Sequence, residues 1–201
     1  MRSYYESNRF SGRWRTNLAG MVKKLLPDGW EGMALLDIGV GDGYTIRLVK
    51  PEGRVTGIDF DTAEVAAARA RGIEAREGSA YHLPFGDETF ELVTSFEVIE
   101  HLESPTTALK EMERILRKGG YLVLSTPVPS LRWKLVWWFW TKLGPGKRWE
   151  KIPHVNELRL GRKGDGELGL VEMLSGLDLH VLRTAKCNYG MVAGLVARKR
   201  A

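Results

Sequence analysis

The segment LLDIGVGDGYT, residues 35–45, constrains the fold of this chain more than any other feature. A short apolar run ends in Asp37 and is followed by glycines at positions 39, 41 and 43. The apolar run predicts a buried strand, and the glycines predict a tight turn into a helix. Glycines at this point also let a ligand approach the backbone closely. The segment therefore predicts a strand–turn–helix unit with a binding site at the carboxyl end of its strand.

Strand and helix patterns alternate through the rest of the chain. The predicted strands cover residues 33–39, 54–61, 73–78, 90–96, 121–127, 178–185 and 190–200. The predicted helices cover residues 44–49, 62–72, 104–120 and 166–177. This alternation predicts an α/β fold with a doubly wound, Rossmann-like, mostly parallel seven-stranded sheet. The short gap between the last two strands predicts an antiparallel C-terminal hairpin.

Composition restricts the class of protein. A chain of 201 residues with 43% hydrophobic content can bury one sizeable core, so we expect a single domain. Cys187 is the only cysteine, which excludes an intrachain disulfide and favours a reducing compartment. The first residues carry no apolar stretch typical of a signal peptide. The longest apolar run, LVWWFW, is shorter than the ~20 residues that span a bilayer. We therefore expect a cytoplasmic protein.

The acidic residues around the glycines narrow the choice of ligand. Asp59 follows the second predicted strand, 18 residues after Gly41, close to the spacing of ~20 for an acid that receives ribose hydroxyls. A dinucleotide site would have G-x-G-x-x-G, whereas this chain has G-x-G-x-G with Asp37 before it and Asp42 inside it. Two acids oppose a pyrophosphate but suit a cationic sulfonium and ammonium. A turn without any ligand is the structural alternative.

Four motifs in order give the chain a family resemblance: LLDIGVGDG, VTGIDFD, EGSAYHLPFGDETFELVTSFEVIEHLESP and EMERILRKGGYLVLSTP. From about Ala34 to Pro127 the chain resembles class I S-adenosylmethionine-dependent methyltransferases, in particular the ubiquinone-biosynthesis-type small-molecule group (methyltransferase type 11). The resemblance implies S-adenosyl-L-methionine as cofactor and methyl transfer to a small-molecule or lipid-like acceptor by in-line displacement. A cofactor-binding but inactive relative acting through an aromatic and basic surface is the alternative, and a nicotinamide dehydrogenase is a more distant one.

The resemblance also implies which residues contact the cofactor. Asp37, Gly39 and Gly41 would surround its methionine part. Asp59 would hold the ribose hydroxyls, and Phe60 would pack on the adenine.

After the third strand, relatives carry an acid and then a small residue, and the acid accepts from the adenine amino group. This chain has Ser79 and Ala80 there, so an uncharged hydroxyl would make a weaker contact. Leu83 matches a residue that walls the pocket, although plain core packing explains it equally well.

The sequence FEVIEHL places Glu97, Glu100 and His101 after the fourth predicted strand, at the ligand-binding edge of such a sheet. Glu97 and His101 would share a face if the segment is helical. Three interpretations stay open. In the first, Glu100 and His101 hold neighbouring loops by hydrogen bonds. In the second, His101 is the general base that takes the acceptor's proton. In the third, the three side chains bind Mg²⁺ or Mn²⁺. Our prediction is a catalytic His101 without a metal.

Residues 128–164 interrupt the alternation and contain five of the seven tryptophans, from Trp133 to Trp149. We interpret the segment as an insertion that shapes the acceptor site, between a cofactor-binding core at 34–127 and a C-terminal part at 165–201. A cap on the domain's own core and a peripheral membrane contact are both compatible with its composition. The net charge of +5 and the pI near 9.3 permit contact with anionic lipid or nucleic acid. Stacking on RNA is less favoured, because no RNA-binding module is recognisable.

Residues 1–33 form a predicted N-terminal cap. By the same resemblance, Tyr4 or Tyr5 would face the carboxylate of the cofactor and Arg9 would pair with it. An exposed basic arm is the alternative. The sequence leaves the methylated atom of the acceptor and the oligomeric state open.

Overall fold

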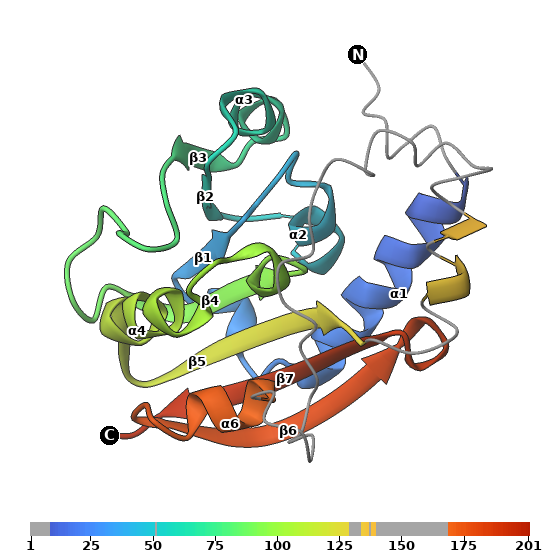
Figure 1. Cartoon of the computed structure of the whole chain (residues 1–201). Coiled ribbons are helices and arrows are strands. Elements are labelled where there is room, and N and C mark those ends of the chain that lie inside the picture. The colour runs from blue at the N-terminus through green and yellow to red at the C-terminus, as the bar shows by residue number, and fades with distance from the viewer. Residues whose placement is uncertain (1–8, 51, 129–133, 137, 140–168) are drawn as a thin grey trace.

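The computed structural model describes residues 9–50, 52–128, 134–136, 138–139 and 169–201 (Figure 1). One seven-stranded sheet has the strand order β3-β2-β1-β4-β5-β7-β6. The first five strands of the chain are parallel, and β7 lies antiparallel between β5 and β6. The predicted Rossmann-like fold with an antiparallel C-terminal hairpin is confirmed.

The elements follow the predicted order along the chain. The strands are β1 Leu35–Ile38, β2 Thr56–Asp59, β3 Glu74–Glu77, β4 Phe90–Phe96, β5 Leu116–Pro127, β6 Leu179–Cys187 and β7 Val192–Lys199. The helices are α1 Arg9–Leu25, α2 Tyr44–Val49, α3 Thr62–Ala70, α4 Pro105–Ile115 and α6 Leu170–Leu174. Short 3₁₀ turns cover Trp30–Gly32, Ile99–His101 and Asn188–Gly190.

Helices cover both faces of the sheet and divide the core into two clusters. On one face, α1, α2 and α3 bury residues such as Val22, Ile46 and Val65. On the other, α4 and α6 bury residues such as Met112 and Leu174. A sheet covered on both faces leaves its strand ends as the places where polar groups can meet a ligand.

The helix after β4 ends earlier than the sequence predicts. The expected helix reaches residue 120, but α4 ends at Ile115 and β5 begins at once with Leu116. Leu116 has an extended backbone and pairs with Phe90 of β4, with an irregular register before Leu92 and Tyr121 pair. Pairing with the sheet therefore overrides the helical pattern of the sequence at this point.

The helix α1 was not predicted. Its buried side chains Leu18, Val22 and Leu25 recur at the spacing of one helical face. They pack in the first core cluster, and the helix contacts α2, β6 and β7. The N-terminal region thus forms part of the folded domain beside the sheet.

Helix α3 begins at Thr62, the first residue of the helix predicted there, and the aspartate before it caps the helix. Asp61 is the N-cap, and its carboxylate accepts a hydrogen bond from the Ala63 N–H at 2.8 Å. Asp61→Ala should lower the free energy of unfolding by about 1 kcal/mol, because it leaves this N–H without its cap. Urea denaturation measures the loss. Asp61→Ser keeps an acceptor and serves as the control, so an equal loss in both variants would contradict the capping role.

Candidate functional site

The glycine turn lies between β1 and α2, at the carboxyl edge of the sheet. The N–H groups of Gly39 and Val40 both donate to the carbonyl of Ile58 in β2, at 2.7 and 3.0 Å. Gly41 has a φ of +52°, and of the described residues a Cβ placed there would meet only Glu64, whose Oε2 lies 3.9 Å away. The backbone at Gly41 is therefore open on the side where a side chain would stand, which leaves room for a ligand.

Asp59 fixes this turn from the end of β2. One carboxylate oxygen accepts from the Gly41 N–H at 2.8 Å, and the other accepts from the Asp61 N–H at 3.0 Å. Each oxygen keeps lone-pair capacity for a further donor such as a ribose hydroxyl. The next residue, Phe60, is 84% exposed, so its ring is available to a flat partner. The structure thus brings Asp59, Gly41 and Phe60 together at one edge.

Asp37 lies at the same edge, near the end of β1, and is buried. Its carboxyl oxygen accepts a hydrogen bond from the Thr94 hydroxyl at 2.6 Å. Burial raises the pKa of Asp37 to about 7, the Thr94 hydrogen bond opposes that rise, and the charge of Asp59 adds to it. A cationic group bound nearby would stabilise the ionised form of this carboxyl group.

Asp42 does not offer its charge to a ligand as the sequence suggested. Its carboxylate lies 3.5 Å from Arg15 and 3.5 Å from Arg71, and it accepts from the Tyr44 N–H at 3.1 Å. Both guanidinium groups also lie over the Tyr44 ring. The two arginines neutralise the charge of Asp42. Any preference of this edge for a cationic ligand therefore depends on Asp37 and Asp59.

The residues predicted to contact the adenine after β3 also have contacts within the protein. The hydroxyl oxygen of Ser79 accepts from the Tyr81 N–H at 3.2 Å, inside a tight turn that His82 closes. Ala80 packs against the second core cluster. The Leu83 side chain is 2% exposed in that cluster, which agrees with the core-packing interpretation.

The segment after β4 does not form the helix that would align Glu97 with His101. Ile99–His101 is a single 3₁₀ turn, and Glu97 has a left-handed backbone with a φ of +55°. The Glu100 carboxylate turns into the core and accepts from the Thr126 hydroxyl at 3.2 Å. His101 Nε2 lies 3.9 Å from the other Glu100 oxygen, and its side chain is partly exposed. Burial raises the pKa of Glu100 well above its usual range.

The metal interpretation has no support from this geometry. Within the described residues, no three His, Cys, Asp or Glu side chains converge as a metal site would require. Glu97 and Glu100 have separate hydrogen-bond partners, Trp14 and Thr126.

Two functional candidates on α1 were missed in the sequence. Trp14 donates its indole N–H to Glu97 at 3.0 Å, and Arg15 donates to the Thr45 hydroxyl at 3.0 Å beside Asp42. An amphipathic pattern could have revealed the helix that carries them, but not these partners. The predicted contacts of Tyr4 and Tyr5 and of the Arg9 side chain lie outside the described residues.

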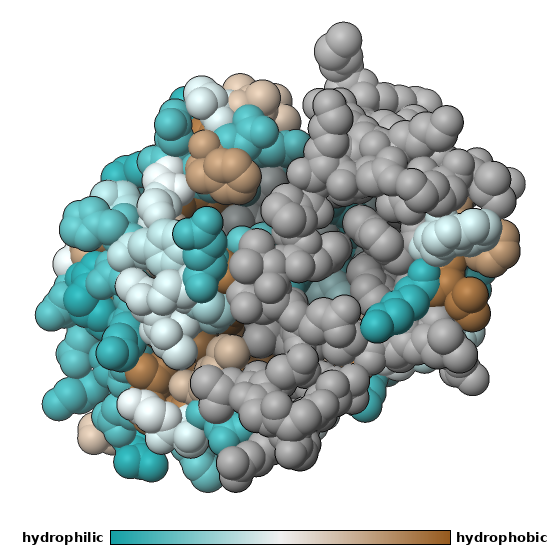
Figure 2. Space-filling view, in the orientation of Figure 1, coloured by the Kyte–Doolittle hydropathy of each residue, from teal (hydrophilic) through white to brown (hydrophobic). Residues whose placement is uncertain are grey.

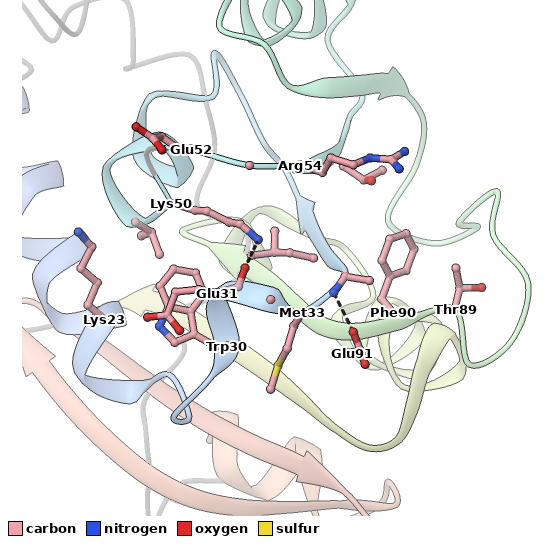
Figure 3. A pocket seen from close by; sticks show the side chains of 16 residues that line it. Lys23, Trp30, Glu31, Met33, Lys50, Glu52, Arg54, Thr89, Phe90 and Glu91 are labelled. Atoms are coloured by element: carbon pink, nitrogen blue, oxygen red, sulfur yellow. Dashed lines mark hydrogen bonds between the residues drawn. The ribbon is translucent and has the colours of Figure 1, made fainter.

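A cavity of about 1260 Å³ lies at the opposite edge of the sheet, where β1, β2 and β4 begin (Figure 3). Trp30, Lys50 and Arg54 are among its lining residues. The Lys50 ammonium donates to the Glu31 carbonyl at 2.9 Å. In open α/β sheets, ligands bind at the carboxyl ends of strands, so this cavity is at the wrong edge for the predicted site. None of the predicted site residues lines it.

The carboxyl edge has the chemistry of an adenosine site with room for cationic groups. An open glycine backbone, buried Asp37 and Asp59 and the exposed Phe60 ring occupy neighbouring strand ends. Glu64, behind Gly41, has a raised pKa because of burial and the charges of Asp42 and Asp59. These residues fit a cofactor with a sulfonium, an ammonium, a ribose and an adenine better than a pyrophosphate.

Comparisons with known proteins agree with this chemistry. Residues 36–124 match the family described as a methyltransferase domain. A probable S-adenosylmethionine-dependent methyltransferase of Mycolicibacterium smegmatis is 39% identical over 99 residues, which are 48% of this chain and 38% of that protein. The phosphatidylethanolamine N-methyltransferase of Cereibacter sphaeroides is 36% identical over 101 residues, 46% of this chain and 50% of that protein. This chain therefore spans half or less of the length of these relatives.

A solved structure shows the same fold. The S-adenosylmethionine-dependent methyltransferase from Mesorhizobium loti superposes with a TM-score of 0.64 at 17% identity. The match covers 88% of this chain and 95% of that one. At this level of identity, the likeness establishes the architecture alone.

Proposed function

We propose that this chain, which carries a class I S-adenosylmethionine-dependent methyltransferase domain of the type 11 group, transfers a methyl group to a small-molecule or lipid-like acceptor. The observation that carries the proposal is the carboxyl edge of β1 and β2. There the open backbone of Gly41 is held by Asp59, next to the exposed ring of Phe60. We also propose a cytoplasmic location, for which the lone Cys187 is the support.

The chain's own residues have a limited chemical task. When bound, S-adenosylmethionine supplies an activated methyl group. Asp37, Gly39 and Gly41 would hold its methionine part, while Asp59 and Phe60 would hold the ribose and the adenine. The protein then has to align the acceptor and exclude water. His101 stays a predicted proton acceptor, and Ser79 a predicted contact of the adenine.

Calorimetric titration of the purified chain tests the proposal. S-adenosylmethionine and S-adenosylhomocysteine should both bind with micromolar dissociation constants, while NAD should not bind. Binding of NAD alone would favour a dehydrogenase and would overturn the proposal. Binding of both sulfur compounds without methyl transfer to any acceptor in broad pools would favour the inactive alternative.

The tryptophan-rich segment 128–164 is proposed to shape the acceptor site and to contact a membrane surface. Of its described residues, Leu135, Trp138 and Phe139 are 50%, 51% and 55% exposed. The Trp138 and Phe139 rings touch edge to face, 4.9 Å apart. By contrast, the coloured surface at the left of Figure 2 is largely hydrophilic. No helix within the described residues is long and apolar enough to cross a bilayer, so we propose a peripheral contact.

The double variant Trp138→Ala, Phe139→Ala should bind anionic lipid vesicles at least tenfold more weakly than the parent, because it removes two aromatic side chains from the proposed contact. Vesicle co-sedimentation measures the partitioning. Leu182→Ala, which removes an apolar side chain that is 44% exposed on β6, is the control. Equal partitioning of the double variant and the parent would count against membrane contact.

A further inference from the structure

Glu97 lies in a backbone conformation that its residue type rarely adopts. Its φ of +55° belongs to the left-handed region, and glycine is the residue that enters that region at little cost. In a regular strand its side chain would share the face of Ser95, opposite to that of Phe96. Instead it meets Trp14 of α1, on the side where Phe96 packs. Strained residues of this kind gather at binding and catalytic sites.

The 3₁₀ turn Asn188–Gly190, which contacts α1, also has a strained backbone. Within the described residues, four non-glycine residues have a positive φ, and three of them are Glu97, Asn188 and Tyr189. Asn188 donates to the Trp14 carbonyl at 3.2 Å, while the Trp14 indole donates to Glu97. Tyr189 is 78% exposed beside this network. One tryptophan of α1 therefore joins both strained segments.

Among the described residues, the Glu97 carboxylate has a hydrogen-bond donor but no cation in direct contact. Trp14 Nε1 lies 3.0 Å from one of its oxygens and 3.4 Å from the other. In the part of the chain that the structure describes, no Lys, Arg or His lies within 4 Å of this carboxylate. Burial raises the pKa of Glu97, the Trp14 hydrogen bond opposes the rise, and the charge of Arg15 opposes it further. A partly buried carboxylate with no cation in contact loses part of its hydration, and a bound cation offsets that loss.

Glu97 borders the cofactor site proposed above. The next residue, Val98, packs so closely on the glycine turn that a Cβ on Gly39 would overlap its side chain. The Glu97 N–H donates to the Ser125 carbonyl at 3.0 Å. The Ser125 hydroxyl is buried and has no hydrogen-bond partner among the described residues, so a further polar group at this strand end is unsatisfied there.

We propose that Glu97, held by Trp14, binds the protonated amine of the acceptor and takes its proton, which makes the acceptor an amine. This inference rests on the proposed methyltransferase function. The ammonium gives one proton to a Glu97 oxygen, and the freed nitrogen lone pair forms the new N–C bond. The donor's C–S bond breaks, and its electron pair stays on sulfur. Glu97 then returns the proton to water.

Calorimetry on the full chain saturated with S-adenosylhomocysteine tests the proposal without needing turnover. The probes are two series, each with an amine, an alcohol and an acid. The first is phenethylamine, 2-phenylethanol and phenylacetate, and the second is decylamine, decanol and decanoate. At least one amine should bind at least tenfold more tightly than its alcohol and its acid. Glu97→Gln should remove that preference, because an amide cannot pair with an ammonium. Glu103→Gln, an exposed change in the same loop, should keep it.

The outcomes separate this proposal from the function on which it rests. Absence of S-adenosylhomocysteine binding refutes the cofactor site itself. If that compound binds but no amine does, or if the alcohols or acids bind as tightly as the amines, the assignment of Glu97 is overturned. An amine preference that survives in Glu97→Gln also overturns it. If Glu97→Gln does not fold, the ranking of amine, alcohol and acid by the parent protein decides, and Trp14→Phe should lower amine affinity.

Discussion

Asp37→Asn should stabilise the folded protein at pH 8 by as much as about 4 kcal/mol while weakening its cofactor site. The pKa of this buried carboxyl is raised from 3.8 to about 7. The folded state therefore binds the proton more tightly than the unfolded state, and stability is lost as the pH rises from about 4 to 7. At ~1.4 kcal/mol for each pKa unit, the full cost is present at pH 8.

Asparagine at position 37 cannot ionise, so it removes the cost of burying a charge there. Its side-chain oxygen can still accept the hydrogen bond from the Thr94 hydroxyl. Urea denaturation at pH 4 and pH 8 measures the effect: the advantage of Asp37→Asn should be small at pH 4 and large at pH 8. Asp28→Asn, at an exposed position, is the control for loss of one negative charge. A stability difference that is the same at both pH values would contradict the raised pKa. The gain at pH 8 should come with weaker S-adenosylhomocysteine binding, since the same carboxylate faces the proposed cationic ligand.

Asp59→Ala should weaken S-adenosylhomocysteine binding by roughly 10- to 150-fold, equivalent to about 1.5–3 kcal/mol. The carboxylate accepts from the N–H groups of Gly41 and Asp61, so its removal frees the turn and takes away the acceptor for the ribose. Calorimetric titration measures the dissociation constant. Asp59→Asn keeps one acceptor oxygen and should lie between the parent and the alanine variant.

Glu77→Gln is the matched control for Asp59. Glu77 ends the neighbouring strand, pairs with Asp59 across the sheet and is exposed. Its carboxylate accepts from the Thr62 hydroxyl at 3.2 Å and, among the described residues, makes no hydrogen bond to the glycine turn. This variant should bind S-adenosylhomocysteine as the parent does. An unchanged dissociation constant in Asp59→Ala would refute the role of Asp59 at the cofactor site.

The elements that could be predicted from the sequence are those determined by residues close to one another along the chain. The helix predicted at 44–49 is α2, because the glycines before it and the apolar strand before them act within a few residues. The antiparallel hairpin was likewise indicated by two adjacent apolar segments. The end of α4 was wrong because Leu116 pairs with Phe90, a contact between distant segments.

The candidate site divides in the same way. The nearness of Asp59 to the glycine turn follows from parallel strands that end at one edge, and the structure shows the hydrogen bond to Gly41. The neutralisation of Asp42 depends on Arg15 and Arg71, which lie 27 and 29 residues away. The contact between Trp14 and Glu97 depends on the positive φ of Glu97, which the sequence does not indicate because the residue there is not a glycine. Such contacts follow from tertiary packing and not from any local pattern.

The position of α1 has a consequence for the order in which the protein is completed during synthesis. Asn17 donates to the side chain of Asn188 at 3.0 Å, and Asn188 is made 171 residues later. Helix α1 also contacts β6 and β7, which are made after the other five strands of the sheet. Helix α1 therefore has its full set of packing partners only after the β6–β7 hairpin has been made. A nascent chain that ends before β6 lacks the Asn188 contact with Trp14, so the proposed acceptor side of the site is completed only after the C-terminal hairpin is made.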